Sequence, residues 1–410
     1  GILLSPSPYA APAAYYFPLV TRLTGVEVIK GAAAIRYGPQ TIGGAINLIT
    51  RPIPDETQAA IDVGAGLHKT VKAHGYAGGG GDWWGVLAEV AHLSSSGFKT
   101  LDTGGPTGFD RQDVMLKGEV RSSKAADVFN SALLKLGYGR EMSNETYLGL
   151  TQADFNEDPN RRYAASHGDQ MKWNRTQAAL IWSLVAGNDF DARTIVYHHR
   201  LKRAWTKLNR FSGGPGLYDL LTEDPGSGQG ATYMDILRGD EDSLSVDHLL
   251  MRGTNDRQFD SYGVQNVMHH RVGIGIVDNE LELGMRYHLD DVARTHTEDP
   301  HVMGNGKLKP TNGDVQTILD RVTTARALAI HLHDDLGIGP VHLVPGLRFE
   351  RITTAAGTPE TGVQDPQTLG IWLPGVGVYA EVTEWLGLLA GLHKGFSPVP
   401  PDSPEETVPE

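Results

Sequence analysis

Histidine and acidic residues with the spacing of metal ligands are the first residues in this sequence that could do chemistry. His331 and His333 lie two apart and Asp335 continues the row, so on a β-strand all three would share one face and could chelate a metal ion. The polar face of a strand often carries such residues without a metal, and we predict no metal site. The adjacent pairs His198–His199 and His269–His270 would point to opposite faces of a strand, so neither pair can share one ion.

Signatures of enzyme active sites are not found in the sequence. The segment from Asp299 to Asp314 contains Asp, Asn and Gly but lacks the spacing of an EF-hand. Gly78–Gly81 is not followed by Lys-Ser/Thr, which indicates a turn and not a phosphate-binding loop. We identify no nucleophile elbow, zincin motif or pair of catalytic carboxylates at a strand end. We therefore predict a protein without enzymatic activity or cofactor, with an all-β hydrolase as the alternative from another class.

Composition narrows the classes of protein further. A chain of 410 residues could form two or three domains or one large barrel. The 36 basic and 49 acidic side chains give a net charge of −13, which argues against nucleic-acid binding. Glycine accounts for 50 of the 410 residues, a share well above the average of roughly 7%. This suits a protein with many strands and turns. The absence of cysteine excludes disulfides, thiolate zinc sites and cysteine nucleophiles.

Membrane segments, if present, would be strands. No run of 18 apolar residues occurs, so no transmembrane helix is predicted. A strand of a membrane barrel needs only about 9–11 residues, with every second one apolar. The start, Gly1 to Leu4, lacks Met and a basic region and is no signal peptide. We expect the chain to begin inside a domain.

Alternation of apolar and polar residues predicts many long strands. In 279–290, one face carries Leu281, Leu283, Met285, Tyr287 and Leu289, and the other carries Glu280, Glu282, Arg286, His288 and Asp290. The same alternation occurs in 59–68, 111–122, 341–350 and 372–392. The charged faces are too polar for the core of a sandwich, and they fit a wall with lipid outside and water inside.

The connections alternate in length. We predict short turns near 79–82, 123–126, 187–189, 278–279, 337–340 and 383–384, and long loops near 98–110, 140–172, 204–256, 297–321 and 353–369. Short turns at one end and long loops at the other are typical of outer-membrane barrels. We count about 13 strands, the last from Glu384 to Phe396. The predicted fold is all-β, a transmembrane antiparallel β-barrel that is incomplete in this sequence.

The first 54 residues have a different pattern. A short apolar strand ends at Gly31, a linker containing Arg36-Tyr37-Gly38-Pro39-Gln40 follows, and Gly43-Gly44 opens a second strand from Ala45 to Thr50. This pattern, up to Arg51-Pro52, closely resembles the end of the plug domain of TonB-dependent outer-membrane receptors. The resemblance implies that 1–54 form the C-terminal part of a plug and 55–410 a partial barrel. Barrels of this family have about 22 strands, so we expect a fragment.

Within this family, the sequence is most similar to the ferric-citrate receptor branch. The similar segments are the Pro-containing stretch Ala10–Pro18, the turn Arg36–Gln40, Thr50-Arg51, Gly149–Phe155, Arg161–Tyr163, Pro345–Glu350 and Gly395–Pro398. Ala32 departs from the pattern, because receptors in general often carry Pro there.

The resemblance implies active import of a ferric chelate, with ferric citrate or a related carboxylate siderophore as the favoured cargo. The chelate would bind between plug apex and barrel wall in the bacterial outer membrane, in contact with outer-membrane lipid and with no role for nucleic acid. The TonB–ExbB–ExbD complex would pull on a plug segment that is absent from this sequence. Another siderophore, cobalamin or a nickel or zinc chelate remain alternative cargoes, and a passive porin is a further alternative.

Candidate ligand residues follow from the implied cargo. Ferric dicitrate is anionic and rich in carboxylate oxygens, which suit the planar fork of arginine. The candidates are Arg36 and Gln40 at the plug turn, Arg161 and Arg162 in the 140–172 loop, and Arg200, Arg203, Arg210 and Arg257 on expected lumen positions. Tyr15, Tyr16 and Phe17 would form an aromatic platform at the plug apex or pack beneath the loops.

Each candidate also has a structural alternative. Arg36 could form a plug–barrel salt bridge, and Arg161 and Arg162 could be solvated loop charges. We expect Arg348 to pair with a carboxylate such as Glu350. Tryptophans near strand ends would anchor the protein at the membrane interface; they are Trp83, Trp84, Trp372 and Trp385.

Overall fold

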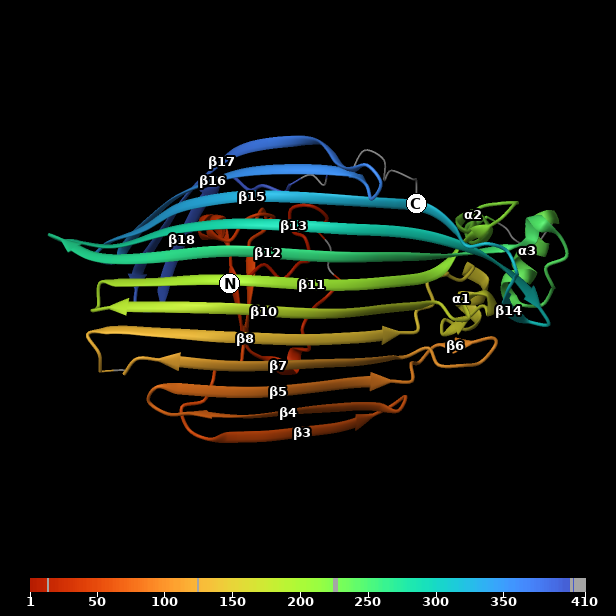
Figure 1. The fold of residues 1–410 in the computed structure, drawn as a ribbon, viewed down its shortest axis with the longest axis horizontal. Helices are drawn as coiled ribbons and strands as arrows, with labels where there is room; N and C mark the ends of the chain where they lie inside the picture. Colours follow the sequence, from red (N-terminus) through yellow and green to blue (C-terminus); the bar gives the residue numbers. More distant parts are fainter. Residues whose placement is uncertain (13–14, 124, 224–227, 399–400, 402–410) are drawn as a thin grey trace.

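One large antiparallel sheet dominates the computed structural model (Figure 1). The structure describes residues 1–410 except 13–14, 124, 224–227, 399–400 and 402–410. The sheet has 14 strands in the order β18-β17-β16-β15-β13-β12-β11-β10-β8-β7-β5-β4-β3, with β14 paired to the end of β13. This agrees with the expected count of about 13. We call this sheet the wall; β3 and β18 are its two ends and do not pair with each other.

The wall strands are longest in the middle of the sheet. Their bounds are β3 Gln58–Gly66, β4 Thr70–Gly80, β5 Trp84–Ser95, β7 Phe109–Arg121, β8 Val128–Ser143, β10 Gln170–Ala186, β11 Phe190–Phe211, β12 Leu250–Ile274, β13 Val277–Gly304, β14 Lys307–Pro310, β15 Gln316–Ile338, β16 Val341–Thr358, β17 Gly362–Thr383 and β18 Leu386–His393. Short turns join them at one end of the sheet, the turn end (Figure 1). The long connections lie at the other end, the loop end, where β3–β4 and β16–β17 are nevertheless joined by short turns.

Several connections differ from the prediction. β11 continues to Phe211 and β12 begins at Leu250, well inside the predicted 204–256 loop. β13 and β15 likewise extend into the predicted 297–321 loop. The predicted 353–369 loop is wrong, because β16 ends at Thr358 and β17 begins at Gly362. Cross-strand backbone hydrogen bonds continue where the side-chain alternation fades, so hydrophobic pattern alone ends these strands too early.

The short turn predicted near 278–279 is present but lies three residues earlier. β12 and β13 meet at Gly275 and Ile276, and Asp278 is already paired with Gly273. Gly275 has a φ of 66°, a conformation that glycine adopts without steric cost in a tight hairpin turn.

The two faces of the wall have opposite chemistry. On β13, Met285 and Tyr287 are 46% and 43% exposed, whereas Arg286 and His288, which alternate with them, are buried. Leu180, Val196, Leu332 and Trp372 are likewise exposed on the convex side. A sheet that exposes apolar side chains outward and buries polar ones inward is the arrangement of a barrel wall in lipid.

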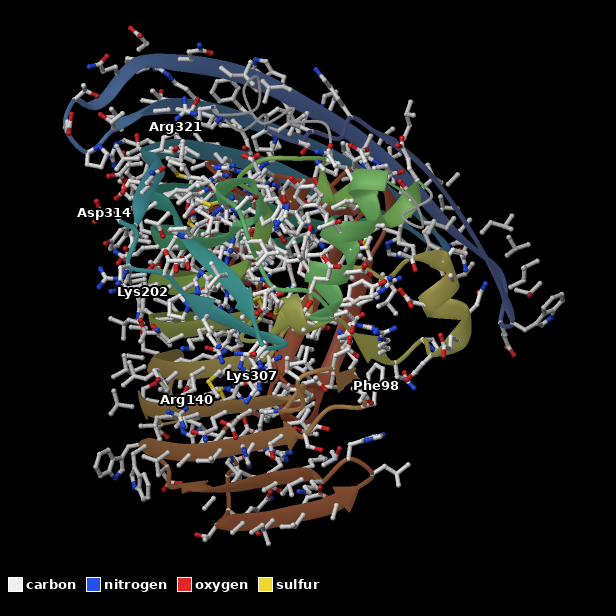
Figure 2. All side chains as sticks on the ribbon, turned by 90° about the vertical axis from the view of Figure 1, so that its right-hand side faces the viewer. Phe98, Arg140, Lys202, Lys307, Asp314 and Arg321 are labelled. Atoms are coloured by element: carbon white, nitrogen blue, oxygen red, sulfur yellow. The ribbon has the colours of Figure 1, made fainter. Side chains whose placement is uncertain are left out.

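The described part of residues 1–54, which we call the N-terminal segment, lies on the concave side of the wall. The segment contains η1 Val20–Arg22, β1 Leu23–Ile29, η2 Gly31–Arg36 and β2 Ala45–Thr50. The two predicted strands are present, and they pair antiparallel. Tyr9, Ala10 and Tyr16 pack in one buried core with wall residues Trp173, Leu201, Phe259, Val292, Ala325, Ala327 and Ile352. Figure 2 looks from the loop end and shows the sheet curving around this segment.

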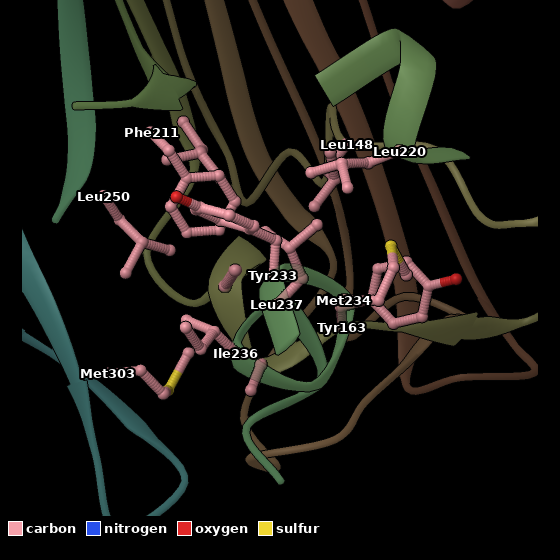
Figure 3. Close-up of a cluster of buried hydrophobic side chains, with 13 residues drawn as sticks. Leu148, Tyr163, Phe211, Leu220, Tyr233, Met234, Ile236, Leu237, Leu250 and Met303 are labelled. Atoms are coloured by element: carbon pink, nitrogen blue, oxygen red, sulfur yellow. The ribbon is translucent and has the colours of Figure 1, made fainter. Parts of the chain in front are cut away.

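Small elements gather at the loop end and form what we call the loop cap. They are β6 Thr100–Leu101, α1 Gln152–Glu157, β9 Arg161–Arg162, η3 Ala164–Ser166, α2 Leu217–Thr222, α3 Gly228–Arg238 and η4 Val246–His248. Their shared core includes Tyr163, Met234, Ile236 and Leu237 (Figure 3). In the part of the chain that the structure describes, no helix is long and apolar enough to cross a bilayer.

Candidate functional site

Four arginines stand directly opposite one another on four neighbouring strands. Arg203 of β11 pairs in register with Arg257 of β12, Arg257 with Arg294 of β13, and Arg294 with Arg321 of β15 (Figure 2 labels Arg321). We call these residues the arginine row. Like charges at directly opposed positions of a sheet repel each other and destabilise it.

The arginine row lies on the concave side of the wall. On each of the four strands, the residue two positions from the arginine toward the turn end points to the same face and is buried. These residues are Leu201, Phe259, Val292 and Thr323. Three of these four belong to the core that packs against the N-terminal segment. Because strand side chains alternate between faces, the row is directed to the same interior as this core.

Arg203 is the most enclosed member of the row. Its side chain is 1% exposed, and its guanidinium lies 4.1 Å from the ring centroid of Tyr15. Its Nη1 donates to the carbonyl oxygen of Asn255 at 3.4 Å. Among the described residues, no carboxylate lies within 4.0 Å of this guanidinium. A buried cation held by an aromatic ring and a carbonyl retains positive charge for an anionic ligand.

Tyr16 is surrounded in the same way. The guanidinium of Arg175 lies 4.4 Å from its ring centroid and that of Arg111 lies 5.7 Å from it. The edge of Trp173 packs against Tyr16 with a centroid distance of 5.3 Å. Arg175 is buried and donates to Gln177 Oε1 and His199 Nδ1, each at 3.2 Å. Tyr15 and Tyr16 therefore hold wall arginines at the interface with the N-terminal segment.

Arg36 and Gln40 lie elsewhere. Arg36 Nη1 donates to Glu282 Oε2 at 2.8 Å, which is the salt bridge to the wall named above as the alternative. Glu282 is twelve residues before Arg294 on β13, which places it about 40 Å from the arginine row at ~3.4 Å per residue. Gln40 donates from Nε2 to the carbonyl oxygen of Pro8 at 3.2 Å. Both residues fasten the N-terminal segment, and neither reaches the row.

Arg161 and Arg162 belong to the loop cap. Arg161 donates from Nε to Asp102 Oδ1 at 3.1 Å and from Nη1 to Asp154 Oδ1 at 3.0 Å. Arg162 donates from Nε to Thr146 Oγ1 at 3.2 Å. Arg162 also lines a cavity of about 610 Å³ together with Tyr147 and Phe155. The two arginines thus hold cap elements together and are not solvated loop charges.

Arg200 corrects the sequence-based placement. The lumen position expected for it is wrong, because it is three residues from Arg203 and therefore on the opposite, convex face. There Arg200 Nε donates to Asp260 Oδ1 at 2.7 Å, and His198 Nε2 lies 3.0 Å from the same oxygen. Arg210 is half exposed and pairs with Glu298 at 2.9 Å.

The other expectations concern histidines and Arg348. Arg348 Nε donates to Glu350 Oε1 at 2.6 Å, which confirms the expected pairing. His331 Nε2 lies 2.7 Å from Glu282 Oε1. Within the described residues, no group of three or more His, Asp or Glu side chains is arranged to hold a metal ion.

Arg111, Arg175, Arg294 and Arg321 were missed by sequence reasoning. Each lies in an alternating strand at a polar position, which is a signal that it faces the interior. Arg111, Arg294 and Arg321 share one level of the sheet and Arg175 is one inward-facing position away. This alignment depends on strand register, which the sequence does not display.

The chain is similar to known proteins in sequence pattern and in fold. The family described as "TonB dependent receptor-like, beta-barrel" matches residues 73–405. The ferric citrate transporter FecA in the unliganded form is similar in fold, with a TM-score of 0.70 and 19% identity over 96% of this chain and 52% of that chain. The ferric-catecholate import receptor Fiu from E. coli K12 has a TM-score of 0.67 and 13% identity over 92% of this chain and 60% of that chain.

A third similar structure is the copper transporter OprC, with a TM-score of 0.59 and 16% identity over 96% of this chain and 54% of that chain. The chain therefore spans about half the length of the solved structures that it matches. At these identities the likeness concerns the fold.

Proposed function

We propose, on the premise that this chain belongs to the TonB-dependent receptor-like β-barrel family, that it is part of a transporter that imports a ferric chelate. The β-barrels of this family are bacterial outer-membrane proteins. In this proposal residues 1–54 are the C-terminal part of the plug and residues 55–410 are part of the barrel. The favoured cargo is ferric citrate or a related carboxylate siderophore.

The arginine row is the observation that supports this cargo. Four guanidinium groups stand at directly opposed positions of neighbouring strands, a concentration of positive charge that matches a polyanionic chelate. Arginine's planar fork matches carboxylate oxygens in pairs. Each hydrogen bond between charged groups contributes roughly 1.5–3 kcal/mol, so three or four of them would give micromolar or tighter binding after the cost of ordering the complex.

The plug tyrosines support a link between cargo and plug. Tyr15 contacts Arg203, and Tyr16 contacts Arg175. A chelate bound to Arg203 would contact a guanidinium that Tyr15 holds in place, so occupancy would be felt in the plug. Pulling by the TonB–ExbB–ExbD complex on a plug segment outside this sequence would then release the cargo inward.

Ferric citrate binding to the intact receptor tests the proposal. Titration would be followed by tryptophan fluorescence, because Trp173 and Trp205 lie beside the site. We expect Arg203→Gln to weaken binding about 10–100-fold, which corresponds to the loss of one or two charged hydrogen bonds. Arg200→Gln removes an arginine from the other face of the same strand and is the matched control. Unchanged affinity in Arg203→Gln and Arg257→Gln would refute the assignment of the site.

An aryl siderophore is the second candidate cargo. Tyr15, Tyr16, Trp173 and Phe259 place aromatic rings beside the same arginines, and aromatic rings can stack on the rings of a catecholate. Competition between ferric citrate and a ferric catecholate on the same preparation separates the two cargoes. Cobalamin or another metal chelate should displace neither ferric citrate nor the ferric catecholate.

A further inference from the structure

Three cations gather on the convex face of the wall, where its apolar surface ends on the side of the loop end. Arg140 of β8, Lys172 of β10 and Lys202 of β11 are exposed and have the parity that points away from the plug. We call them the outer basic cluster; Figure 2 labels Arg140 and Lys202. None of the three makes a hydrogen bond or ion pair with another residue in the described part of the chain.

Strand register brings these cations together. Asn174 of β10 is directly opposite Arg140 on one side and Lys202 on the other. Lys172 is the next outward-facing residue on β10, toward the loop end. Directly opposed side chains have Cβ atoms about 4.5–5.5 Å apart, so all three side chains can reach a common point above Asn174. A cavity of about 470 Å³ lies there, with all three cations in its lining.

Three carboxylates also line this cavity, and one of them, Glu141, pairs with Arg111 at 3.6 Å. Asp110 is engaged by His92, whose Nε2 lies 2.7 Å from its Oδ2. Asp256 projects from β12 beyond Lys202, and no ion pair joins it to the cluster among the described residues. The cavity therefore has three cations against one unengaged carboxylate, a balance that favours an anion.

The position of the cluster identifies the kind of anion. Tyr138, one outward-facing residue below Arg140, is 44% exposed, and Leu136, Leu180 and Val196 below it are 39%, 50% and 52% exposed. Arg140 lies only about 7 Å above Tyr138 at ~3.4 Å per residue. On β11, His198 and Arg200 lie on the same face between Val196 and Lys202. The cations thus stand just beyond the apolar band, which ends at Tyr138 on β8 and at Val196 on β11, and this is the level of lipid headgroups in a bilayer.

We propose that the outer basic cluster binds the phosphate group of an anionic lipid in the leaflet on the loop side. The acyl chains of that lipid would lie on Leu136, Leu180 and Val196, while its phosphate accepts hydrogen bonds from the guanidinium and the two ammonium groups. The proposal requires a membrane-embedded wall and is independent of the cargo.

Binding of phosphatidic acid to the intact receptor in detergent tests the proposal, with diacylglycerol of the same acyl chains as the phosphate-free comparison. Native mass spectrometry would measure the fraction of receptor that carries each lipid. We expect the triple variant Arg140→Gln, Lys172→Gln and Lys202→Gln to bind phosphatidic acid at least tenfold more weakly than the wild type. Wild-type receptor should bind diacylglycerol about as weakly as that variant does.

The control variant, Lys307→Gln, Lys309→Gln and Arg351→Gln, removes three exposed cations elsewhere and should bind phosphatidic acid as the wild type does. A charge-retaining variant, Arg140→Lys, Lys172→Arg and Lys202→Arg, should also bind it and covers the case in which the neutral variant fails to fold. Equal binding by the neutral and control variants would overturn the proposal. So would equal binding of diacylglycerol to wild-type receptor, or full displacement of the lipid by millimolar inorganic phosphate, which would indicate a site for the free anion.

Discussion

Arg36 of the N-terminal segment and Glu282 of strand β13 form an ion pair with 2.8 Å between Nη1 and Oε2. His269 and His331 also lie within 3.0 Å of the Glu282 carboxylate. The carbonyl oxygen of Arg36 accepts a hydrogen bond from Arg348 at 3.0 Å. One short stretch of the segment is thereby attached to two strands of the wall, near the turn end.

Loss of this ion pair should loosen the segment locally. Arg36→Gln leaves a carboxylate at the interface without its guanidinium partner, which we expect to cost about 1–3 kcal/mol, less than for a fully buried pair. Hydrogen exchange of the amides in η2 and β2 should become faster by a corresponding factor. Arg271→Gln breaks an exposed pair with Asp191 and should change exchange little. Equal exchange in both variants would show that Arg36 carries no such load.

Tyr15 should act on cargo binding through its ring and not its hydroxyl. Tyr15→Phe keeps the ring beneath Arg203 and should leave ferric citrate affinity close to the wild-type value. Tyr15→Leu removes a cation–π contact of about 0.5–2 kcal/mol and should weaken binding roughly 2–30-fold. Fluorescence titration of both variants measures this difference, and a larger effect of Tyr15→Phe would contradict it.

Asp169 should make the stability of the loop cap depend on pH. It is 1% exposed and lies 3.8 Å from Arg252, and burial raises its pKa to about 7 although Arg252 lowers it. The unfolded carboxyl titrates near ~3.9, so between about pH 4 and 7 the folded cap holds a proton that the unfolded chain has lost. Stability therefore falls as pH rises through this window, by at most about tenfold per pH unit in the opening equilibrium.

Protease cleavage of the cap at pH 5 and pH 8 measures that dependence. Asp169→Asn should remove the pH dependence, whereas Asp314→Asn, which changes an exposed loop carboxylate, should retain it. A pH dependence that persists in Asp169→Asn would assign the effect to another group.

Truncating a side chain in the core of the loop cap should loosen the cap and leave the wall folded. Leu237 is 0% exposed in the core shown in Figure 3, and Leu237→Ala should cost about 2–5 kcal/mol. Leu244 is 84% exposed, so Leu244→Ala should have no comparable effect. Limited proteolysis should cleave the cap of Leu237→Ala first, while the mobility of the unheated protein on gels stays that of a folded barrel.

Most of the wall could be predicted from alternation alone. The run from Leu281 to Leu289 identifies both faces of β13, because a wall between lipid and water separates the residue types most sharply. The same signal fails beyond the lipid, where both faces are polar, so the end of β16 at Thr358 was placed too early.

The candidate site was less predictable. Arg203 and Arg200 were both expected inside, although their spacing of three residues assigns them to opposite faces of any regular strand. Arg294 and Arg321 were overlooked because their alignment with Arg257 depends on the pairing of strands that are far apart in sequence. The salt bridge of Arg36 with the wall required the tertiary position of Glu282, which no local pattern contains.

Lys202 and Arg203 are consecutive residues that serve different surroundings, one beside lipid and one beside the plug. Inserting or deleting a single residue between the turn end and Lys202, without a compensating bulge, would exchange the two environments and bring the lysine inward and the arginine to the outer face. A new cargo preference should therefore evolve by substitutions within the wall strands and by changes of length in the connections at the loop end. Recombination between related receptors should preserve function only where the breakpoints leave the number of residues in each wall strand unchanged.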